Sequence, residues 1–456
     1  MSTYLGVTVR PERIGSIQDL RDYFQKYAKP EGTERIGIEC ELFGVHRETG
    51  EALPYSGVIG IEAVLNKLAS EFGYEGIHEK GHTIGLKKGN TIISLEPGGQ
   101  IELSAEPISN LHQAKAQLDE FFFHLRTVAH FLGPIAWLGS GIHPFSPLNR
   151  IPWVPKQRYQ IMARYLARRG RKAHDMMKRT ATNQINFDYH SEEDAIEKMR
   201  LVLVVTPIAA AMFANSSLSQ GKLSGYLTER LYIWQNTDPD RCGLILNMIC
   251  ENCKFEDYLN YVLDVPMMFI VRGAKWIVTR NLTFRKFIQN GYQGIRPTES
   301  DFELHLSTIF TDARFKQYLE IRGMDGQRSH LISSVYAFWK GILYDGEARR
   351  AAKHLVQRFR EKDIRNLHQQ VERLGLRARI RGERVLELAR ELVRISEKGL
   401  KAQRHLNEQE EDERIYLLPL KEEVLKTART PAEQVAHLWQ ESFKRDRRAV
   451  IDYMAI

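Results

Sequence analysis

The sequence predicts an α+β protein, and three features support this fold class. Residues 35–145 contain segments in which apolar and polar residues alternate with a period of two, separated by glycine-rich turn signals. From Glu347 onward, Arg, Glu, Leu and Ala recur at helical spacing, and Gly and Pro are rare. Hydrophobic residues make up 43% of the 456 positions, so the chain can bury a core and disorder is excluded as its main state.

Each part of the chain has its own predicted structure. The first 30 residues read as a helical lead-in, and one clear helix, residues 111–132, interrupts the strands that follow. Ser191, which precedes three acidic residues, resembles a capping box that opens a helix running into a long apolar stretch. Short strands and helices then alternate. We therefore expect one domain over residues 1–345 and a helical C-terminal region, 346–456, packed on it.

Composition and charge exclude several classes of protein. The longest uncharged apolar run, residues 201–214, contains Pro207 and is shorter than the roughly 18 residues that span a bilayer, so we expect a buried helix and no membrane segment. Four cysteines are too few for a secreted disulfide scaffold, and residues 1–16 lack the apolar core of a signal peptide. The sequence therefore predicts a soluble cytoplasmic protein. Its net charge of +8 suits nucleotides, small carboxylates or nucleic acid, without choosing among them.

Four of the predicted strands carry polar side chains on one face. In the first of them, Ile38 and Cys40 alternate with Glu39 and Glu41. The polar positions of the four strands are Glu39 and Glu41; Gln100, Glu102 and Ser104; Thr182, Gln184, Asn186 and Asp188; and Tyr318, Glu320 and Arg322. Each strand alone is compatible with an ordinary half-exposed strand whose polar side chains meet water. Together, their richness in Glu, Gln and Asn indicates a shared polar surface.

If these strands share a sheet, their carboxylates converge. Two carboxylates about 4 Å apart repel by roughly 4 kcal/mol at an effective dielectric of 20, so such a cluster requires protons or bound cations. Oxygen ligands of this kind favour Mg²⁺ or Mn²⁺. A carboxylate-lined face with arginines nearby suits phosphoryl transfer from Mg-ATP, because metal neutralises phosphate charge and arginine stabilises the transferring group. The spacing of residues within each strand does not establish that the four strands are neighbours in the sheet.

Several longer motifs resemble one enzyme family. They are SLEPGGQIELS (94–104), WVPKQRYQIM (153–162), MMKRTATNQINFDY (176–189), ANSSLSQGK (214–222), IWQNTDPDR (233–241) and YLEIRGMDG (318–326). In this order they resemble glutamate–cysteine ligase of the plant and proteobacterial type, within the glutamine synthetase-like superfamily of carboxylate–amine ligases. The resemblance covers residues 35–345 and returns weakly at TPAEQVAHLW (430–439).

The resemblance implies a fold and a reaction. The expected fold is a curved, mainly antiparallel sheet with the active site on its concave face and helices packed on the other side. In the expected reaction, ATP phosphorylates the side-chain carboxylate of L-glutamate. The amine of L-cysteine then displaces phosphate to give γ-glutamylcysteine, the first step of glutathione biosynthesis. We expect glutamate, cysteine and ATP as partners, no nucleic acid and no membrane, and a monomer or a homodimer.

The resemblance also assigns roles to residues at matching positions. Two or three Mg²⁺ ions, with Mn²⁺ as an alternative, are expected at Glu39, Glu41, Glu96, Glu102, Gln184 and Glu320. Gln184 is the weaker ligand because its amide is neutral. Arg322 and Arg230 are the expected catalytic residues, with Arg322 toward phosphate or glutamate and Arg230 toward a substrate carboxylate. The residues expected to bind substrate are Arg179, Asn186, Asn215, Ser216 and Trp234.

Two alternatives stay open at this point. A ligase of the same fold with another acceptor amine, for example in ergothioneine synthesis, would keep the same metal and ATP residues. A nucleic-acid-binding protein would use the basic helical C-terminus, but it has no need of carboxylates on four strands.

The cysteines give little evidence of a metal site or a redox switch. Cys250 and Cys253 form a lone C-x-x-C that is weak evidence for zinc, and residues 276–296, where redox-regulated plant members carry paired cysteines, contain none.

Overall fold

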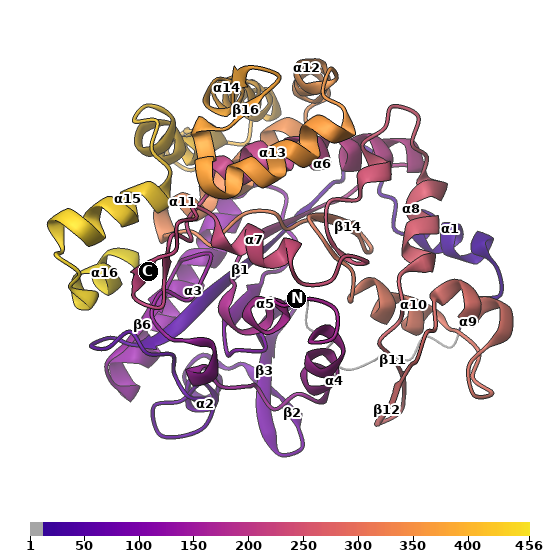
Figure 1. Ribbon diagram of the computed structural model, residues 1–456, viewed down its shortest axis with the longest axis horizontal. Coiled ribbons are helices and arrows are strands. Elements are labelled where there is room, and N and C mark those ends of the chain that lie inside the picture. The colour runs from indigo at the N-terminus through magenta and orange to yellow at the C-terminus, as the bar shows by residue number, and fades with distance from the viewer. Residues whose placement is uncertain (1–11) are drawn as a thin grey trace.

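An antiparallel sheet runs through the centre of the molecule (Figure 1). The computed structural model describes residues 12–456. Its central strands are β1 (Ile36–His46), β2 (Glu75–Glu79), β3 (His82–Lys88), β4 (Thr91–Leu95), β5 (Ile101–Ser104), β6 (Ile135–Leu138), β7 (Asn183–Phe187), β14 (Ala313–Phe315) and β15 (Leu319–Ile321). Within the described residues these nine strands follow the order β14-β15-β7-β1-β5-β4-β3-β2, and β6 pairs with β1. Every neighbouring pair is antiparallel, as predicted.

Strand β1 is the centre of this sheet. Its N-terminal half pairs with β5 on one side and β7 on the other, and its C-terminal half pairs with β6. The apolar residues Ile36, Ile38, Cys40 and Leu42 are fully buried in the main core. Helices α3 (Leu111–Leu132) and α11 (Ser329–Leu343) contribute to the same core and contact each other. Because side chains alternate along a strand, the glutamates of β1 point away from this core.

Two helices confirm specific sequence expectations. Helix α3 has the predicted bounds, and α6 (Glu192–Met212) begins at Ser191, whose hydroxyl accepts from the Asp194 backbone N–H. The return bond differs from the expected capping box, because the Asp194 carboxylate accepts from the backbone N–H of His190, one residue earlier. Pro207 lies inside α6 and is buried, as the apolar stretch predicts.

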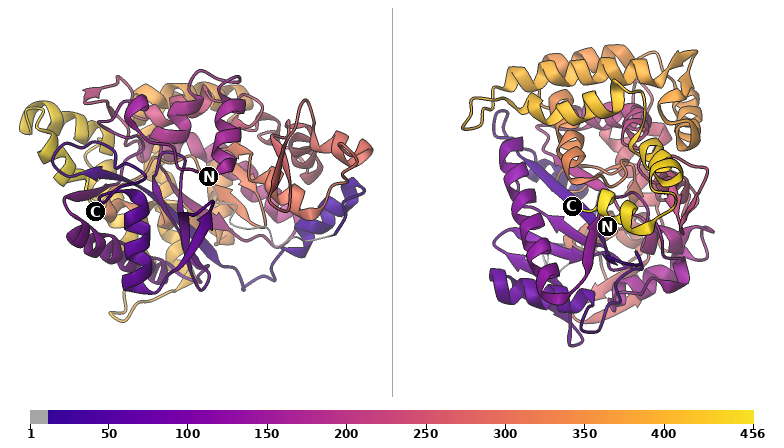
Figure 2. Two further views of the ribbon diagram at one scale, coloured as in Figure 1. Left: turned by 90° about the horizontal axis from the view of Figure 1, so that it is seen from below. Right: turned by 90° about the vertical axis from the view of Figure 1, so that its left-hand side faces the viewer.

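The C-terminal part of the chain is helical, as predicted. It contains α12 (Gly346–Val356), α13 (Glu361–Leu374), α14 (Val385–Gln403), α15 (Pro431–His437) and α16 (Arg447–Met454). A short hairpin, β16 (Arg379–Ile380) and β17 (Glu383–Arg384), was not predicted. Helices α12 to α14 form a layer on one side of the molecule (Figure 2). The main apolar core contains residues from Ile14 to Leu425, among them buried residues of α12, α13 and α14. The predicted domain boundary at residue 345 stays a prediction.

The remaining elements surround the sheet. The helices are α1 (Ile17–Lys26), α2 (Ile61–Phe72), α4 (Gln157–Leu166), α5 (Ala173–Arg179), α7 (Glu229–Gln235), α8 (Phe255–Asp264), α9 (Phe284–Asn290) and α10 (Glu299–Leu306). The short strands are β8 (Leu218–Ser219), β9 (Lys222–Leu223), β10 (Cys242–Gly243), β11 (Phe269–Arg272), β12 (Lys275–Val278) and β13 (Phe310–Thr311). Helix α1 covers part of the predicted lead-in, and residues 1–11 lie outside the described residues. Among the residues described, no helix has the length and hydropathy that crossing a membrane requires.

Candidate active site

The register of the sheet brings the predicted carboxylates onto one face. Glu41 on β1 lies opposite Glu102 on β5. Glu39, two positions along β1, lies opposite Gln184 on β7. Glu320 lies on β15, which pairs with the other edge of β7. All five side chains are buried. The four polar strands are therefore neighbours, which the sequence alone did not establish.

Three of these carboxylates form a close group. Glu41, Glu96 and Glu102 each offer an oxygen within 4.8 Å of the others. Glu96 joins from the turn after β4, where a Cβ on Gly98 would lie 2.4 Å from the carbonyl oxygen of Lys178, so the chain requires glycine there. Burial, followed by the neighbouring carboxylates, raises the pKa of Glu41 to about 8. Burial and Glu96 also raise the pKa of Glu102. This three-carboxylate group holds unfavourable negative charge that a cation would relieve.

The donor set of this face fits Mg²⁺. Among the described residues, Oε2 of Glu39 and Oε1 of Glu102 are buried and have no hydrogen-bond donor. A buried acceptor without a donor costs about 1–3 kcal/mol. Burial, and then repulsion from Glu320 and Glu102, raises the pKa of Glu39 to about 7. Hard divalent cations coordinate carboxylate oxygens of this kind, so the residues present suit the metal that the sequence predicts.

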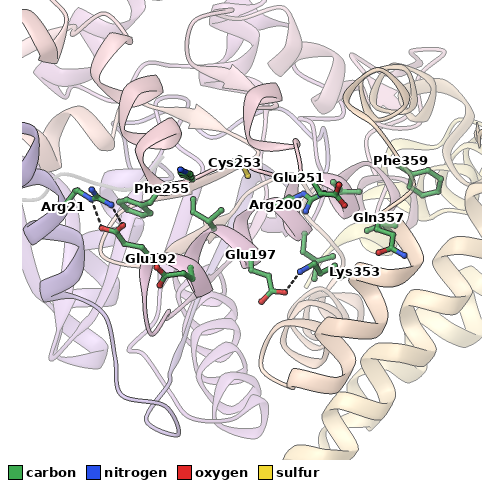
Figure 3. A pocket seen from close by; sticks show the side chains of 16 residues that line it. Arg21, Glu192, Glu197, Arg200, Glu251, Cys253, Phe255, Lys353, Gln357 and Phe359 are labelled. Carbon is green, nitrogen blue, oxygen red and sulfur yellow. Dashed lines mark hydrogen bonds and ion pairs between the residues drawn. The ribbon is translucent and has the colours of Figure 1, made fainter.

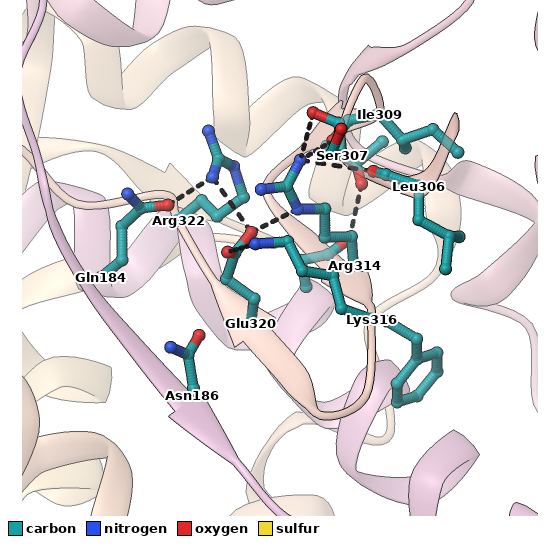
Figure 4. A network of polar contacts seen from close by, with 12 residues as sticks. Gln184, Asn186, Leu306, Ser307, Ile309, Arg314, Lys316, Glu320 and Arg322 are labelled. Atoms are coloured by element: carbon teal, nitrogen blue, oxygen red, sulfur yellow. Dashed lines mark hydrogen bonds and ion pairs between the residues drawn. The ribbon is translucent and has the colours of Figure 1, made fainter. Parts of the chain in front are cut away.

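Glu320 lies in a different environment, a network of cations (Figure 4). Lys316 Nζ donates to Oε1 of Glu320 at 2.6 Å, and Arg322 Nη1 donates to Oε2 at 3.0 Å. Arg314, opposite Glu320 on β14, also donates to Oε2. Burial alone would raise the pKa of Glu320, but these three cations hold it well below its usual range. Glu320 is therefore ionised, and the protein itself compensates its charge.

Gln184 and Asn186 connect the two environments. Gln184 Nε2 donates to Oε1 of Glu41 at 3.2 Å, and its amide oxygen accepts from Arg322 Nη1. Asn186 Nδ2 donates to Oε1 of Glu39 at 3.1 Å. The amide oxygen of Asn186 has no donor among the described residues, so it can accept from a substrate. The metal role of Gln184 stays a prediction, because both ends of its amide already bind side chains.

Two arginines pack against Trp234 beside the carboxylate face. The guanidinium carbons of Arg230 and Arg322 lie 5.7 and 5.8 Å from its ring centroid, within cation–π range. Arg230 Nη2 also donates to the carbonyl oxygen of Arg322 at 2.9 Å. Among the described residues, Arg230 Nε and the indole N–H of Trp234 have no acceptor although they are buried. This cluster presents positive charge and unused donors, which suits a phosphate or a carboxylate.

Asn215 and Ser216 hold the segment between α6 and β8 in place through hydrogen bonds. Asn215 Nδ2 donates to the carbonyl oxygens of Gly139 and Gly326 at 3.1 and 2.8 Å. Ser216 Oγ donates to Oδ2 of Asp325 at 2.7 Å. Both amide hydrogens of Asn215 are therefore used by backbone, and the Ser216 hydroxyl hydrogen is used by a carboxylate. Their place in the substrate pocket stays a prediction, and it would have to rely on their oxygens.

Arg179 lies apart from the other predicted arginines. It is buried, with Nη1 donating to Asp175 at 2.8 Å and Nη2 donating to Ser219 at 2.6 Å. None of its hydrogen bonds among the described residues reaches the carboxylate face. Its predicted role in holding a substrate carboxylate therefore stays a prediction.

The sequence reading missed several cations of the site. Arg314 and Lys316 alternate with apolar residues just before the strand of Glu320, which is the same period-two signal that identified the other strands. Lys156, within a quoted motif, is buried, and its Nζ donates to the carbonyl oxygen of Leu95 at 3.1 Å. Burial lowers the pKa of Lys156 to about 8, and the charge of Glu96 opposes that shift. Lys156 therefore places a cation beside the three-carboxylate group.

A second missed feature ties helix α13 to the site. Nε2 of His368 lies 2.7 Å from Oδ2 of Asp312, and its Nδ1 lies 2.8 Å from Nε2 of Gln235. The carbonyl oxygen of Asp312 accepts from the backbone N–H of Arg322 at 2.8 Å. Gln235 directly follows Trp234 in α7. His368 thus braces both segments that carry the arginine–tryptophan cluster, and a single histidine on a helix carries no sequence signal of such a role.

Comparisons with known proteins identify relatives of this chain. A family model described as Glutamate-cysteine ligase family 2 (GCS2) matches residues 35–449. Glutamate–cysteine ligase B, chloroplastic, of Oryza sativa subsp. japonica is 37% identical over 431 residues, which are 94% of this chain and 85% of that protein. The chloroplastic glutamate–cysteine ligase of Arabidopsis thaliana is 36% identical over 425 residues, covering 92% and 79%.

Two solved structures share the fold. A glutamate–cysteine ligase from Francisella tularensis in complex with AMP gives a TM-score of 0.56 at 12% identity, covering 94% of this chain and 88% of that one. A bifunctional glutathione synthetase from Pasteurella multocida gives 0.51 at 13% identity, covering 96% and 53%. These likenesses confirm the predicted fold class, an antiparallel sheet combined with many helices.

The expected cytoplasmic location is wrong on these comparisons. The plant relatives are named as chloroplastic enzymes, and this contradicts the expectation of a cytoplasmic protein. The expectation used the low cysteine count and the absence of a recognised signal peptide. A low cysteine count separates reducing from oxidising compartments, but it does not distinguish one reducing compartment from another.

Proposed function

We infer that this chain, which belongs to glutamate–cysteine ligase family 2, joins the γ-carboxylate of L-glutamate to the amine of L-cysteine in a reaction driven by ATP. The names of its plant relatives support this activity. The observation that carries the proposal is the buried three-carboxylate group on the same sheet face as the arginine–tryptophan cluster. Phosphoryl transfer to a carboxylate needs both features, oxygen ligands for Mg-ATP and fixed cations for the transferring group.

We assign the metal ligands by comparing the groups that surround each buried carboxylate. Glu41, Glu96 and Glu102 would hold Mg²⁺, and Glu39, with its buried oxygen, is the next candidate. When bound, Mg²⁺ neutralises charge on the ATP phosphates. Glu320 was predicted as a further ligand. Because cations of the protein surround its carboxylate, we assign it first to orienting Arg322.

The arginines would hold the reacting groups. The glutamate γ-carboxylate attacks the terminal phosphorus of ATP, giving γ-glutamyl phosphate and ADP. The cysteine amine then attacks the carbonyl carbon, and phosphate leaves as the amide bond forms. Arg322 and Arg230 can each contact two oxygens of a carboxylate or phosphate through a planar guanidinium group. Trp234 packs against both arginines and would help to exclude water, which would otherwise hydrolyse the acyl phosphate.

The division of labour along the chain follows from these contacts. We propose that residues 1–345 supply the groups that meet substrate and that the helical region 346–456 supports them. The contacts of His368 with Asp312 and Gln235 are the specific support for this proposal. The assembly as a monomer or homodimer stays a prediction.

A panel of acceptor amines tests the proposed activity. Purified protein is incubated with Mg-ATP, glutamate and one amine at a time, while ADP release and product mass are followed. We expect ADP release that requires glutamate and cysteine together, with a product of the mass of γ-glutamylcysteine. Faster turnover with another amine would assign a different acceptor to the same fold. ADP release that no amine accelerates would contradict a ligase.

A further inference from the structure

A cavity of about 440 Å³ lies away from the carboxylate face, between helices α6, α8 and α12 (Figure 3). Its wall is largely apolar, formed by the buried side chains Ile196, Leu201, Val204, Phe255, Val356 and Phe359. A volume of a few hundred Å³ with mostly apolar walls and a few polar groups is typical of small-molecule sites. None of these residues takes part in the proposed ligase reaction.

Two cations around this cavity are paired with carboxylates, and a third, Arg200, donates a hydrogen bond only to a backbone carbonyl oxygen among the described residues. Arg21 binds the Glu192 carboxylate through two hydrogen bonds, of 3.1 and 2.7 Å, and Lys353 lies 3.0 Å from a carboxylate oxygen of Glu197. Arg200 is half-buried, and its Nε donates to the carbonyl oxygen of Ile249 at 3.2 Å. This bond orients the guanidinium group and leaves its two terminal nitrogens without a partner among the described residues.

Arg200 is therefore the half-buried charge of the cavity that lacks a counter-ion among the described residues. Glu193 and Glu251 also line the cavity, but both are exposed, and neither forms an ion pair with Arg200. An exposed carboxylate keeps its hydration, whereas a half-buried guanidinium gains more from a charged partner. We propose that this cavity binds a small amphipathic anion, with its apolar body against the Phe255 and Phe359 wall and its single anionic group on Arg200.

Two dyes that differ only in charge test this assignment. 8-Anilinonaphthalene-1-sulfonate carries an aromatic body and one sulfonate, and N-phenyl-1-naphthylamine is the same ring system without the sulfonate. Wild-type protein should bind the sulfonate dye at one saturable site. Arg200→Gln should weaken that binding about tenfold, the scale of one charge-assisted hydrogen bond, and should change binding of the neutral dye less than about twofold. Glu251→Gln is the matched control and should not weaken either dye.

Filling the cavity provides an independent test. Val204→Trp and Val356→Trp place an indole in it from two different helices, and both should abolish binding of both dyes. Each variant is first checked by near-UV circular dichroism, because partly unfolded proteins also bind such dyes. If one filling variant loses its fold, the other decides, and the two dyes on Arg200→Gln decide without either. Equal effects of Arg200→Gln on both dyes, or undiminished binding in a folded filling variant, would overturn the proposal.

Discussion

Two ends of one sheet face bury carboxylates in opposite ways. At β15, Glu320 is surrounded by three cations of the protein, and its pKa is held low. At β1 and β5, Glu41, Glu96 and Glu102 lie chiefly against one another, and the pKa of Glu41 is raised to about 8. A buried anion is stable when the fold supplies its counter-ion. Folding therefore supplies the counter-ions of the first site, whereas under the proposed function a bound cation would supply those of the second.

The largest expected effect is on stability, at the cation network. Glu320→Gln removes the anion shared by Arg314, Lys316 and Arg322 and leaves buried cations without a counter-ion. We expect the free energy of unfolding to fall by about 3–5 kcal/mol. Denaturant titration without Mg²⁺ measures this change. Glu75→Gln, at an exposed position of β2, is the control and should change it by less than about 0.5 kcal/mol. A loss no larger than the control's would remove the basis of the comparison.

The three-carboxylate group should respond in the opposite way. Glu41→Gln relieves repulsion in the metal-free protein, so the free energy of unfolding should not fall. Turnover with Mg-ATP, glutamate and cysteine should fall by about a hundredfold, the scale of one lost electrostatic contact in a transition state. Denaturant titration and steady-state kinetics on the same preparation measure both quantities. Near-normal turnover would contradict the metal assignment, and a stability loss like that of Glu320→Gln would erase the difference between the two ends.

Arg322 links the two ends, and its geometry can be separated from its charge. Arg322→Lys keeps the charge. Nη1 of Arg322 donates to both Gln184 and Glu320, and the planar guanidinium group holds further donors in fixed directions that a single ammonium nitrogen does not offer. We expect turnover to fall about tenfold, corresponding to one hydrogen bond to a charged group. Steady-state rates of the two proteins measure this change, with Arg35→Lys, at the exposed position directly before β1, as the control. Equal rates for Arg322→Lys and wild type would mean that Arg322 only balances the charge of Glu320.

The smallest expected effect is that of oxidation. Charge and not thiol chemistry organises this face, because Cys40 lies on the buried apolar side of β1. Burial raises the pKa of Cys242 to about 12 and that of Cys253 to about 11, so both stay protonated and react slowly. We expect activity to change less than about twofold between oxidant and dithiothreitol, below a typical allosteric coupling. Cys250→Ser is the control. A large oxidant effect that disappears in this variant would reveal a switch at the C-x-x-C.

The sequence by itself determined which side chains of one strand point to the same side. Strand side chains alternate, so Glu39 and Glu41 had to point away from Ile38 and Cys40 wherever β1 was placed. The same local rule located helix α3 and the start of α6 at Ser191, because helical periodicity and an N-cap depend only on neighbouring residues. The long motifs identified the family for a related reason, since they record side chains required together at one site.

Only the tertiary structure decided what surrounds each carboxylate. Glu41 and Glu320 look alike in the sequence, as each is a polar residue in an alternating strand. Their environments differ because β1 pairs with β5, which brings Glu102, whereas β15 pairs with β14, which brings Arg314. The pairing of β1 with β5 joins residues far apart in the chain, so local patterns do not specify it. Strands β14 and β15 are consecutive, and there the sequence interpretation missed a local alternating pattern. The protonation and ligand affinity of a carboxylate depend on such neighbours, and for that reason the two ends of the face became distinguishable only in the folded protein.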